Sequence, residues 1–162
     1  MLTKMGIKCL IDGQSQLFSR RVYMYKHILI TTDLTDDNNI IQQGGDLAQK
    51  LNAQLSLVHV IEPVPSYGYS AFSDIDNQGI NHAKEALAKL GENLNVEKGN
   101  QHIEVGQAKK KILQLAENLE ADLIITGSHG KHGLAYLLGS TANAILHGAT
   151  CDVLTIRNES EQ

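Results

Sequence analysis

The sequence is poor in cysteine and in long apolar runs. Its two cysteines, Cys9 and Cys151, lie far apart, so no disulfide framework is predicted and a reducing, cytoplasmic compartment is expected. No apolar run reaches the roughly 18 residues of a membrane-spanning helix. The apolar run at 9–11 stops at Asp12 and Gly13, before it could form the core of a signal peptide. We therefore expect no membrane partner.

An excess of positive charge is also missing. Lysine and arginine total 14 against 18 acidic residues, which gives a formal net charge of -4. Proteins that bind nucleic acids need a basic face to displace counterions, so nucleic acid is not an expected partner. The one basic cluster in the body of the chain, Lys109 to Lys111, is interpreted as a solvated helix face.

What remains is typical of one globular domain. The 162 residues, 42% hydrophobic and 20% charged, suffice for a single core and are too few for two comfortable domains. Residues 1–23 have no sustained period and are predicted to be an N-terminal extension, either disordered or upstream of a natural start at Met24; an ordered extension is the alternative. We place the domain at 24–158 and a polar tail at 159–162.

Short apolar segments alternate with apolar stripes at helical spacing. The segments typical of buried strands are 27–32, 54–61, 102–106, 122–127 and 151–157. The stripes predict helices at 39–51, at 80–94, around 112–119 and from about 139 to 146. This alternation favours parallel pairing with right-handed crossovers, which makes the fold class α/β with a doubly wound parallel sheet of five strands.

In such sheets a ligand binds at the carboxyl ends of the strands, where the strand order reverses. The end of the first strand at Thr32 and Asp33, the end of the second at Val60, and the glycine segment 127–143 should converge there. Asp33 could instead serve only as a turn residue or a helix N-cap.

The glycine segment reads "GSHGKHGLAYLLGSTAN". Gly127, Gly130 and Gly133 can adopt positive φ and leave backbone N–H groups uncovered, as in an anion-binding nest. Gly139, Ser140 and Thr141 then begin a helix, whose N–H groups favour the same charge. The segment is not a P-loop, because it has no Gly-Lys-Ser/Thr triplet. By itself it could be a phosphate cradle or only a turn.

Other constellations carry less weight. His129 and His132, with His147 as a third ligand, would make a weak zinc site because no cysteine or placed carboxylate accompanies them, so no metal is predicted. No histidine or acid is placed to activate Cys151, which is interpreted as a buried structural thiol. No general base is evident beyond Asp33. Catalytic residues are therefore not predicted, and any nucleotide hydrolysis should be slow.

Several segments resemble the universal stress protein family, in order and at the expected separations. They are "MYKHILITTDLT", "LVHVIEP", "ADLIITGSHG" and "LLGSTANAILHGATCDVLTIR", which together cover about residues 24–158. The resemblance implies a HUP-type fold with strand order 3-2-1-4-5, a homodimer formed through the last strand (151–157), and a cytoplasmic stress role without committed catalysis. The family has two subclasses, of which only one binds ATP.

The ATP-binding subclass has the signature Gly, two residues, Gly, nine residues, Gly, then Ser or Thr. This chain has Gly127 and Gly130 but only eight residues before Gly139. Carried over by motif, the resemblance gives Asp33 to the adenosine end, the backbone of Val60 to adenine, Gly127 and Gly130 to the phosphate loop, and Gly139, Ser140 and Thr141 to the phosphates.

The resemblance thus predicts a site for ATP or another adenine nucleotide, with or without Mg²⁺. The shorter spacer could move the helix start relative to the loop. The alternatives are a nucleotide-free universal stress protein that acts only through protein contacts, and an adenylate-forming or phosphatase-like enzyme. The sequence lacks the Ser-Gly-Gly phosphate motif that such enzymes use.

Overall fold

The structure is a computed structural model that describes residues 25–34, 39–63, 77–128 and 138–157. The extension expected at 1–23 and the tail expected at 159–162 lie outside the described residues, as do Gly130 and Gly133 of the glycine segment.

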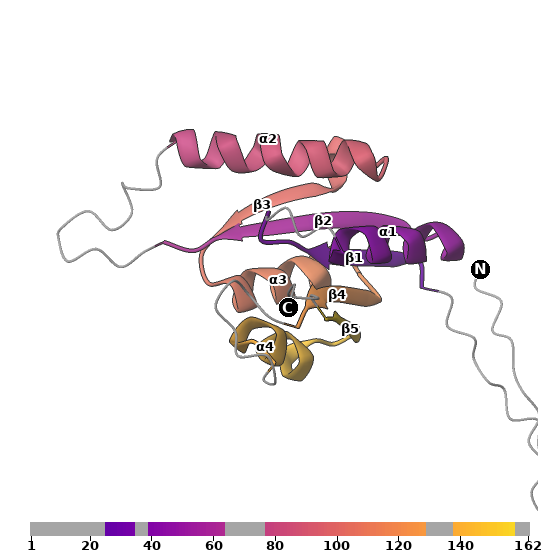
Figure 1. Cartoon of the computed structure of the whole chain (residues 1–162). Coiled ribbons are helices and arrows are strands. Elements are labelled where there is room, and N and C mark those ends of the chain that lie inside the picture. The colour runs from indigo at the N-terminus through magenta and orange to yellow at the C-terminus, as the bar shows by residue number, and fades with distance from the viewer. Residues whose placement is uncertain (1–24, 35–38, 64–76, 129–137, 158–162) are drawn as a thin grey trace, which may run out of the picture.

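The described chain folds into one five-stranded parallel sheet of order β3-β2-β1-β4-β5 (Figure 1). Its strands are β1 (His27–Thr31), β2 (Gln54–Ile61), β3 (Gln101–Val105), β4 (Leu123–Gly127) and β5 (Asp152–Ile156). The helices are α1 (Asn39–Leu51), α2 (Asn77–Asn93), α3 (Ala108–Asn118) and α4 (Ser140–Gly148), with a 3₁₀ turn η1 (Lys98–Asn100). The predicted α/β class and strand order are confirmed.

The predicted strands agree with the structure to within one residue at each end, whereas two helices begin earlier than predicted. The apolar stripe of α2 starts at Ile80, but the helix begins at Asn77 because its first turn is polar. In the same way, α3 begins at Ala108, and the lysines from Lys109 occupy its first turns. An apolar stripe marks the buried face of a helix and carries no information about a polar first turn.

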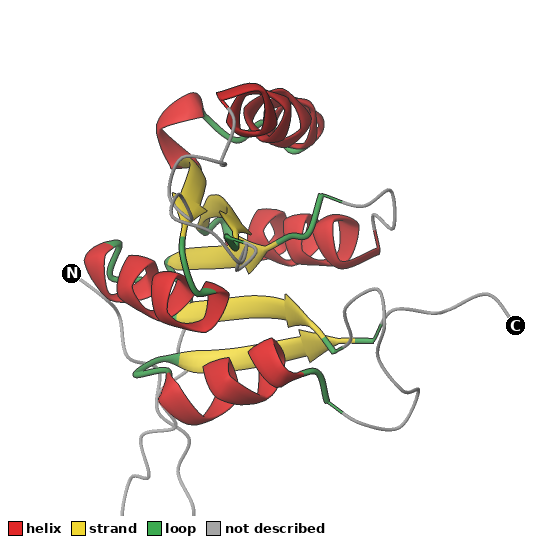
Figure 2. Ribbon diagram, turned by 90° about the vertical axis from the view of Figure 1, so that its left-hand side faces the viewer, coloured by secondary structure: helices red, strands yellow, loops and turns green. Residues whose placement is uncertain are grey.

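The two faces of the sheet are covered by different helices, as Figure 2 shows. In β1, Ile28 and Ile30 belong to the core cluster shared with α1 and α2, while Leu29 belongs to the cluster shared with α3 and α4. All three are 0% exposed. The continuous apolar run of β1 therefore reflects burial on both faces, which is the expected property of a central parallel strand.

Polar contacts fix the amino ends of the central strands. The Asp122 carboxylate accepts from the backbone N–H groups of Lys26 (3.0 Å) and His27 (3.3 Å). His27 Nδ1 donates to the Leu119 carbonyl (2.9 Å), so its Nε2 accepts from the buried Ser56 hydroxyl (2.8 Å). These contacts hold the amino ends of the strands together. The carboxyl ends, at the opposite end of the sheet, are left to form a site.

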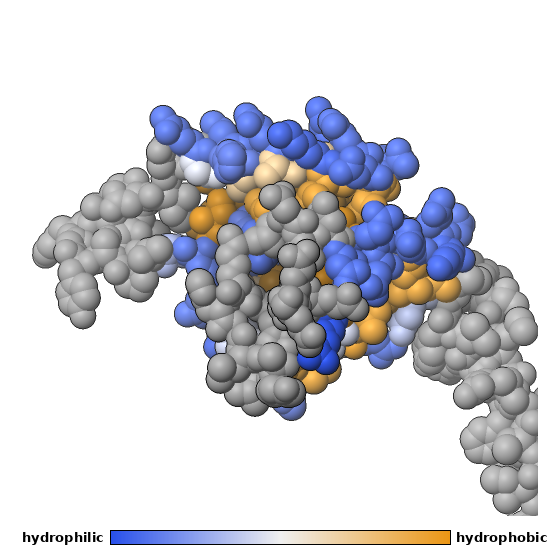
Figure 3. Space-filling model, viewed as in Figure 1, coloured by the Kyte–Doolittle hydropathy of each residue, from blue (hydrophilic) through white to orange (hydrophobic). Residues whose placement is uncertain are grey.

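The surface over α2 is polar, as the blue band above the orange interior in Figure 3 shows. The large apolar side chains that are exposed include Val105 on β3 and Leu154 on β5, the two edge strands of the sheet. Among the described residues, no helix has both the length and the apolar character that crossing a bilayer requires.

His102 on β3 is a polar residue whose side chain is partly buried without full hydrogen bonding. Within the described part of the chain, its Nε2 atom is buried and has no hydrogen-bond partner. Burial lowers the pKa of His102 below the ordinary histidine value; the nearby His27 adds to this shift and Glu104 opposes it. The folded protein therefore disfavours the protonated form of this side chain.

We expect His102→Leu to reduce the loss of stability in mild acid. Because the folded-state pKa is lowered, the unfolded chain takes up the proton first as the pH falls through about 6.5. The wild type should therefore lose free energy of unfolding between that pH and the lower folded-state pKa. Denaturant unfolding at about pH 7.5 and about pH 5.5 measures the effect. His82→Gln, at an exposed histidine of α2, is the control and should lose as much as the wild type. An equal loss in His102→Leu would show that His102 does not contribute.

Candidate functional site

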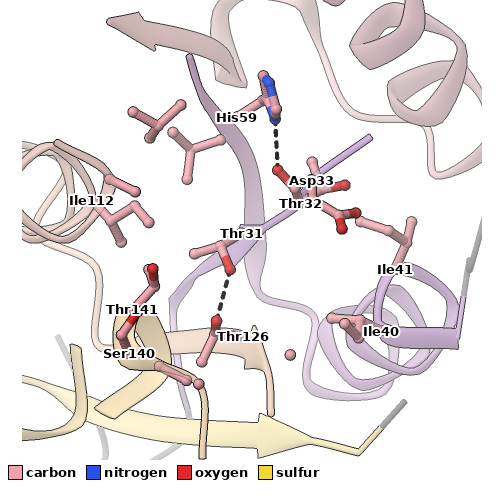
Figure 4. A pocket seen from close by; sticks show the side chains of 16 residues that line it. Thr31, Thr32, Asp33, Ile40, Ile41, His59, Ile112, Thr126, Ser140 and Thr141 are labelled. Atoms are coloured by element: carbon pink, nitrogen blue, oxygen red, sulfur yellow. Dashed lines mark hydrogen bonds between the residues drawn. The ribbon is translucent and has the colours of Figure 1, made fainter. Parts of the chain in front are cut away.

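The carboxyl ends of β1, β2 and β4 meet the start of α4 around one pocket of about 280 Å³ (Figure 4). This volume is close to the lower limit, about 300 Å³, of typical small-molecule sites. Six of the seven predicted site residues line the pocket: Asp33, Val60, Gly127, Gly139, Ser140 and Thr141. The seventh, Gly130, lies outside the described residues.

The strand order explains why the pocket forms here. The chain leaves β1 toward α1 on one face of the sheet and leaves the neighbouring β4 toward α4 on the other face. Connections that diverge in this way leave a crevice at the carboxyl ends of the two strands. Asp33 lies at its exposed rim, and the next residue, Leu34, has a φ of +59° and donates its N–H to Thr32 Oγ1 (3.0 Å). This tight turn holds strain beside the site.

One wall of the pocket is rich in hydrogen-bond donors. Gly139 is the N-cap of α4 and has no side-chain cap, and the first intrahelical bond runs from the N–H of Asn143 to the Gly139 carbonyl (2.8 Å). The N–H groups of Ser140, Thr141 and Ala142 therefore precede the helical ladder at the positive end of the helix dipole. All three residues line the pocket, and two of them add hydroxyls. This wall is suited to a negatively charged group.

Two parts of the glycine segment are hydrogen-bonded to each other. The Gly139 N–H donates to the Ser128 carbonyl (2.8 Å), and the Ser128 N–H donates to the Ile156 carbonyl of β5 (2.8 Å). The start of α4 is thereby tied to the end of β4. Gly127, which precedes Ser128 in the chain, therefore lies close to the helix start.

The pocket is also lined by apolar side chains. Val60 comes from the end of β2, Ala108 and Ile112 from α3, and Ile40 and Ile41 from α1. In Figure 4, Ile112 lies beside Thr141, and Ile40 and Ile41 lie across the pocket from it. The Glu62 carboxylate accepts from the Ala108 N–H (2.6 Å) and so holds the start of α3 against the end of β2. A flat aromatic group can lie between these apolar side chains, while the donor wall holds an attached anion.

Three polar pocket residues were not predicted from the sequence. Thr31 Oγ1 donates to Thr126 Oγ1 (2.9 Å), and His59 Nδ1 donates to the Thr32 carbonyl (2.8 Å). Threonine is β-branched and is typical of strands, so Thr31 and Thr126 gave no separate signal. Their positions could have indicated a role, because each lies at the carboxyl end of a buried strand.

The weak zinc site and the reactive cysteine considered above can be compared with the structure in part. His129 and His132 lie outside the described residues. Among the residues that are described, no three His, Cys, Asp or Glu side chains come together as a metal site would need. The prediction that Cys151 is buried is wrong: it is partly exposed, since it precedes the edge strand β5. Partial burial still raises the pKa of its thiol, which favours the protonated, unreactive form.

The lysine cluster is also only partly the solvated face that its sequence predicted. Lys109 and Lys110 are exposed, whereas Lys111 is half-buried and pairs with Glu104 of β3 over 3.1 Å.

Comparison with known proteins identifies the family. Residues 24–157 match the model of the universal stress protein family. The chain belongs to this family. Two curated relatives of this universal stress protein, both from Coxiella burnetii, are universal stress protein A homologs 1 and 2. They are 44% and 41% identical over 139 residues, which cover 82% of this chain and 96% and 95% of the respective relatives.

A solved structure gives the same answer for the fold. The universal stress protein UspA from Lactobacillus plantarum has a TM-score of 0.69 to this universal stress protein and is 25% identical to it. The alignment covers 82% of this chain and 98% of the other. The family and fold predicted from the sequence motifs are thus confirmed.

Proposed function

We propose that this universal stress protein binds an adenine nucleotide, with ATP as the first candidate, in the pocket at the carboxyl ends of β1, β2 and β4. Asp33 holds the adenosine end and the backbone of Val60 faces adenine. The glycine segment, including Gly127 and Gly130, holds the phosphates together with Gly139, Ser140 and Thr141. The observation that carries the proposal is the convergence of six of these seven residues on one pocket.

The chemistry of the pocket matches the order of groups in a nucleotide. The apolar side chains of Val60, Ala108 and Ile112 fit the flat base, and the N–H groups and hydroxyls at the start of α4 fit the phosphates. Asp33 at the rim offers a carboxylate to the groups of adenosine that can donate a hydrogen bond. A Mg²⁺ ion that enters with the phosphates would neutralise part of their charge.

Structural relatives support a nucleotide as the ligand. One universal stress protein was solved in complex with cAMP; it has a TM-score of 0.64 to this chain and is 21% identical to it. Another, from Archaeoglobus fulgidus, was solved in complex with dAMP, with a TM-score of 0.61 and 18% identity. These ligands belong to those proteins, and they share adenine, a sugar and a phosphate with the ligand proposed here.

The proposed role is binding rather than turnover. Apart from Asp33 and His59, the polar groups that line the described pocket are hydroxyls and backbone groups, which bind and orient an anion. Nδ1 of His59 donates to the Thr32 carbonyl. The bound nucleotide would then act as a signal of the cytoplasmic energy state during stress, and any hydrolysis should be slow.

The protein is also proposed to act as a homodimer through β5. This strand is the last in the sheet order, so no strand of the described residues pairs with its outer side, which is available to a partner strand. Leu154 in the middle of β5 is 39% exposed and provides apolar surface at the same edge.

Mass spectrometry of the small molecules released from the purified, denatured full chain tests the nucleotide proposal. We expect an adenine nucleotide near one per chain, or binding at that ratio in calorimetry after addition of ATP and Mg²⁺. The one-residue departure in the spacer makes a nucleotide-free protein the second candidate. An empty site that stays empty after incubation with ATP and Mg²⁺ would favour that candidate.

A further inference from the structure

Thr31 and Thr126 form a hydroxyl pair on the floor of the pocket (Figure 4). Thr31 Oγ1 donates to Thr126 Oγ1 over 2.9 Å, from β1 to the adjacent β4. Thr126 is only 5% exposed. The pair is therefore held by two central strands of the sheet and not by a loop.

The two threonines have two O–H donors, and the hydrogen bond between them uses only one of these. Each threonine contributes one O–H donor and an oxygen that can accept, and the mutual bond uses the donor of Thr31. Among the described residues, Thr126 Oγ1 makes no hydrogen bond other than the one from Thr31. The O–H of Thr126 can therefore rotate toward an acceptor in the pocket.

The surroundings of Thr126 contain the donors that would share such an acceptor. Gly127 follows it in the chain, and Ser140 and Thr141 line the same pocket beside it, as Figure 4 shows for the two hydroxyl residues. The positive end of α4 points to the same space. An oxygen held by the first turn of α4 would thus lie within a group of donors, one of which belongs to the sheet.

We propose that Thr126 is a further ligand-binding residue, which donates its hydroxyl to a phosphate oxygen of the nucleotide, and that Thr31 is the positioning residue for that hydroxyl. The inference rests on the proposed function, since it names an additional contact at the same site. Donation from Thr31 polarises the O–H of Thr126 and strengthens its bond to a charged acceptor.

The test compares ATP with adenosine, which lacks phosphate, by calorimetry on the full chain. Thr126→Val keeps the branched shape that suits a strand and removes only the hydroxyl. It should weaken ATP binding about ten-fold and leave adenosine binding unchanged. Thr126→Ser keeps the hydroxyl and should retain most of the ATP affinity. Thr31→Val leaves the Thr126 hydroxyl in place and should cause a smaller loss, of about two- to three-fold.

Thermal unfolding of each variant is the control for folding, and Thr126→Ala is a second hydroxyl-free variant if the valine is not tolerated. Equal ATP affinity in the wild type and in a folded hydroxyl-free variant would overturn the inference while leaving the proposed function intact. An equal loss for ATP and adenosine would overturn the assignment to phosphate. A wild type that binds neither compound would overturn the proposed function, and this inference with it.

Discussion

Replacing Asp33 by alanine is expected to weaken the binding of ATP and of adenosine by about the same factor, ten- to one hundred-fold. Asp33 follows β1 at the rim of the pocket, away from the start of α4 that is proposed to hold the phosphates. A hydrogen bond to a charged group contributes about 1.5–3 kcal/mol. At 1.4 kcal/mol for each factor of ten, the loss of one such bond gives the stated range.

Calorimetric titration of both compounds measures this effect and separates it from that of Thr126→Val, which should affect ATP alone. Asp33→Asn retains one acceptor oxygen without the charge and should lie between the wild type and the alanine variant. Asp46→Ala is the matched control, because Asp46 is an exposed aspartate on α1 that does not line this pocket. A loss confined to ATP would place Asp33 at the phosphates and contradict its assignment.

Thr155→Pro is expected to weaken the proposed homodimer. The Ile156 carbonyl accepts from the Ser128 N–H, so the backbone groups of Ile156 face inward, toward β4. Backbone groups of successive residues in a strand point to opposite sides, so those of Thr155 face the open edge and those of Leu154 face β4. Proline at 155 removes a donor from the edge alone, whereas proline at 154 would remove a donor from the pairing with β4 instead.

In a symmetric dimer this change removes one donor from each copy. Two lost hydrogen bonds amount to about 1–3 kcal/mol, or a roughly five- to 150-fold weaker dimer. Sedimentation over a range of concentrations measures the shift. Val105→Pro is the control at the other edge, because Gly106 donates to the Ile61 carbonyl and Val105 therefore faces away from β2. A Thr155→Pro variant that dimerises like the wild type would exclude β5 as the interface.

The fold could be predicted because each central strand carries its own burial pattern. Ile28, Leu29 and Ile30 are apolar in succession, which is the pattern expected of a strand covered on both faces. The beginning of α2 at Asn77 and the turn η1 were missed, because a polar first turn and a three-residue 3₁₀ helix leave no periodic signal. Local patterns therefore define the buried parts of elements better than their ends.

The lining of the candidate pocket could be predicted where residue types with a known backbone role recur in the sequence. Gly139, Ser140 and Thr141 are residue types that open helices and bind anions, and they line the pocket as expected. Contacts between distant residues leave no such mark. The capping of Ala108 by Glu62 joins positions 46 apart, and the bond between Thr31 and Thr126 joins positions 95 apart. Such pairs become visible only once the strand order is known.

The most direct test of the central claim is a titration of the isotope-labelled full chain with ATP and Mg²⁺, followed by proton–nitrogen correlation spectra. The account predicts saturable shifts of the backbone amides of Asp33, Val60 and Gly127 and of those from Gly139 to Thr141. The amides of η1, which lie at the amino end of β3, should not move. Spectra that stay unchanged at millimolar ATP, or saturable shifts that avoid the pocket, would contradict the account.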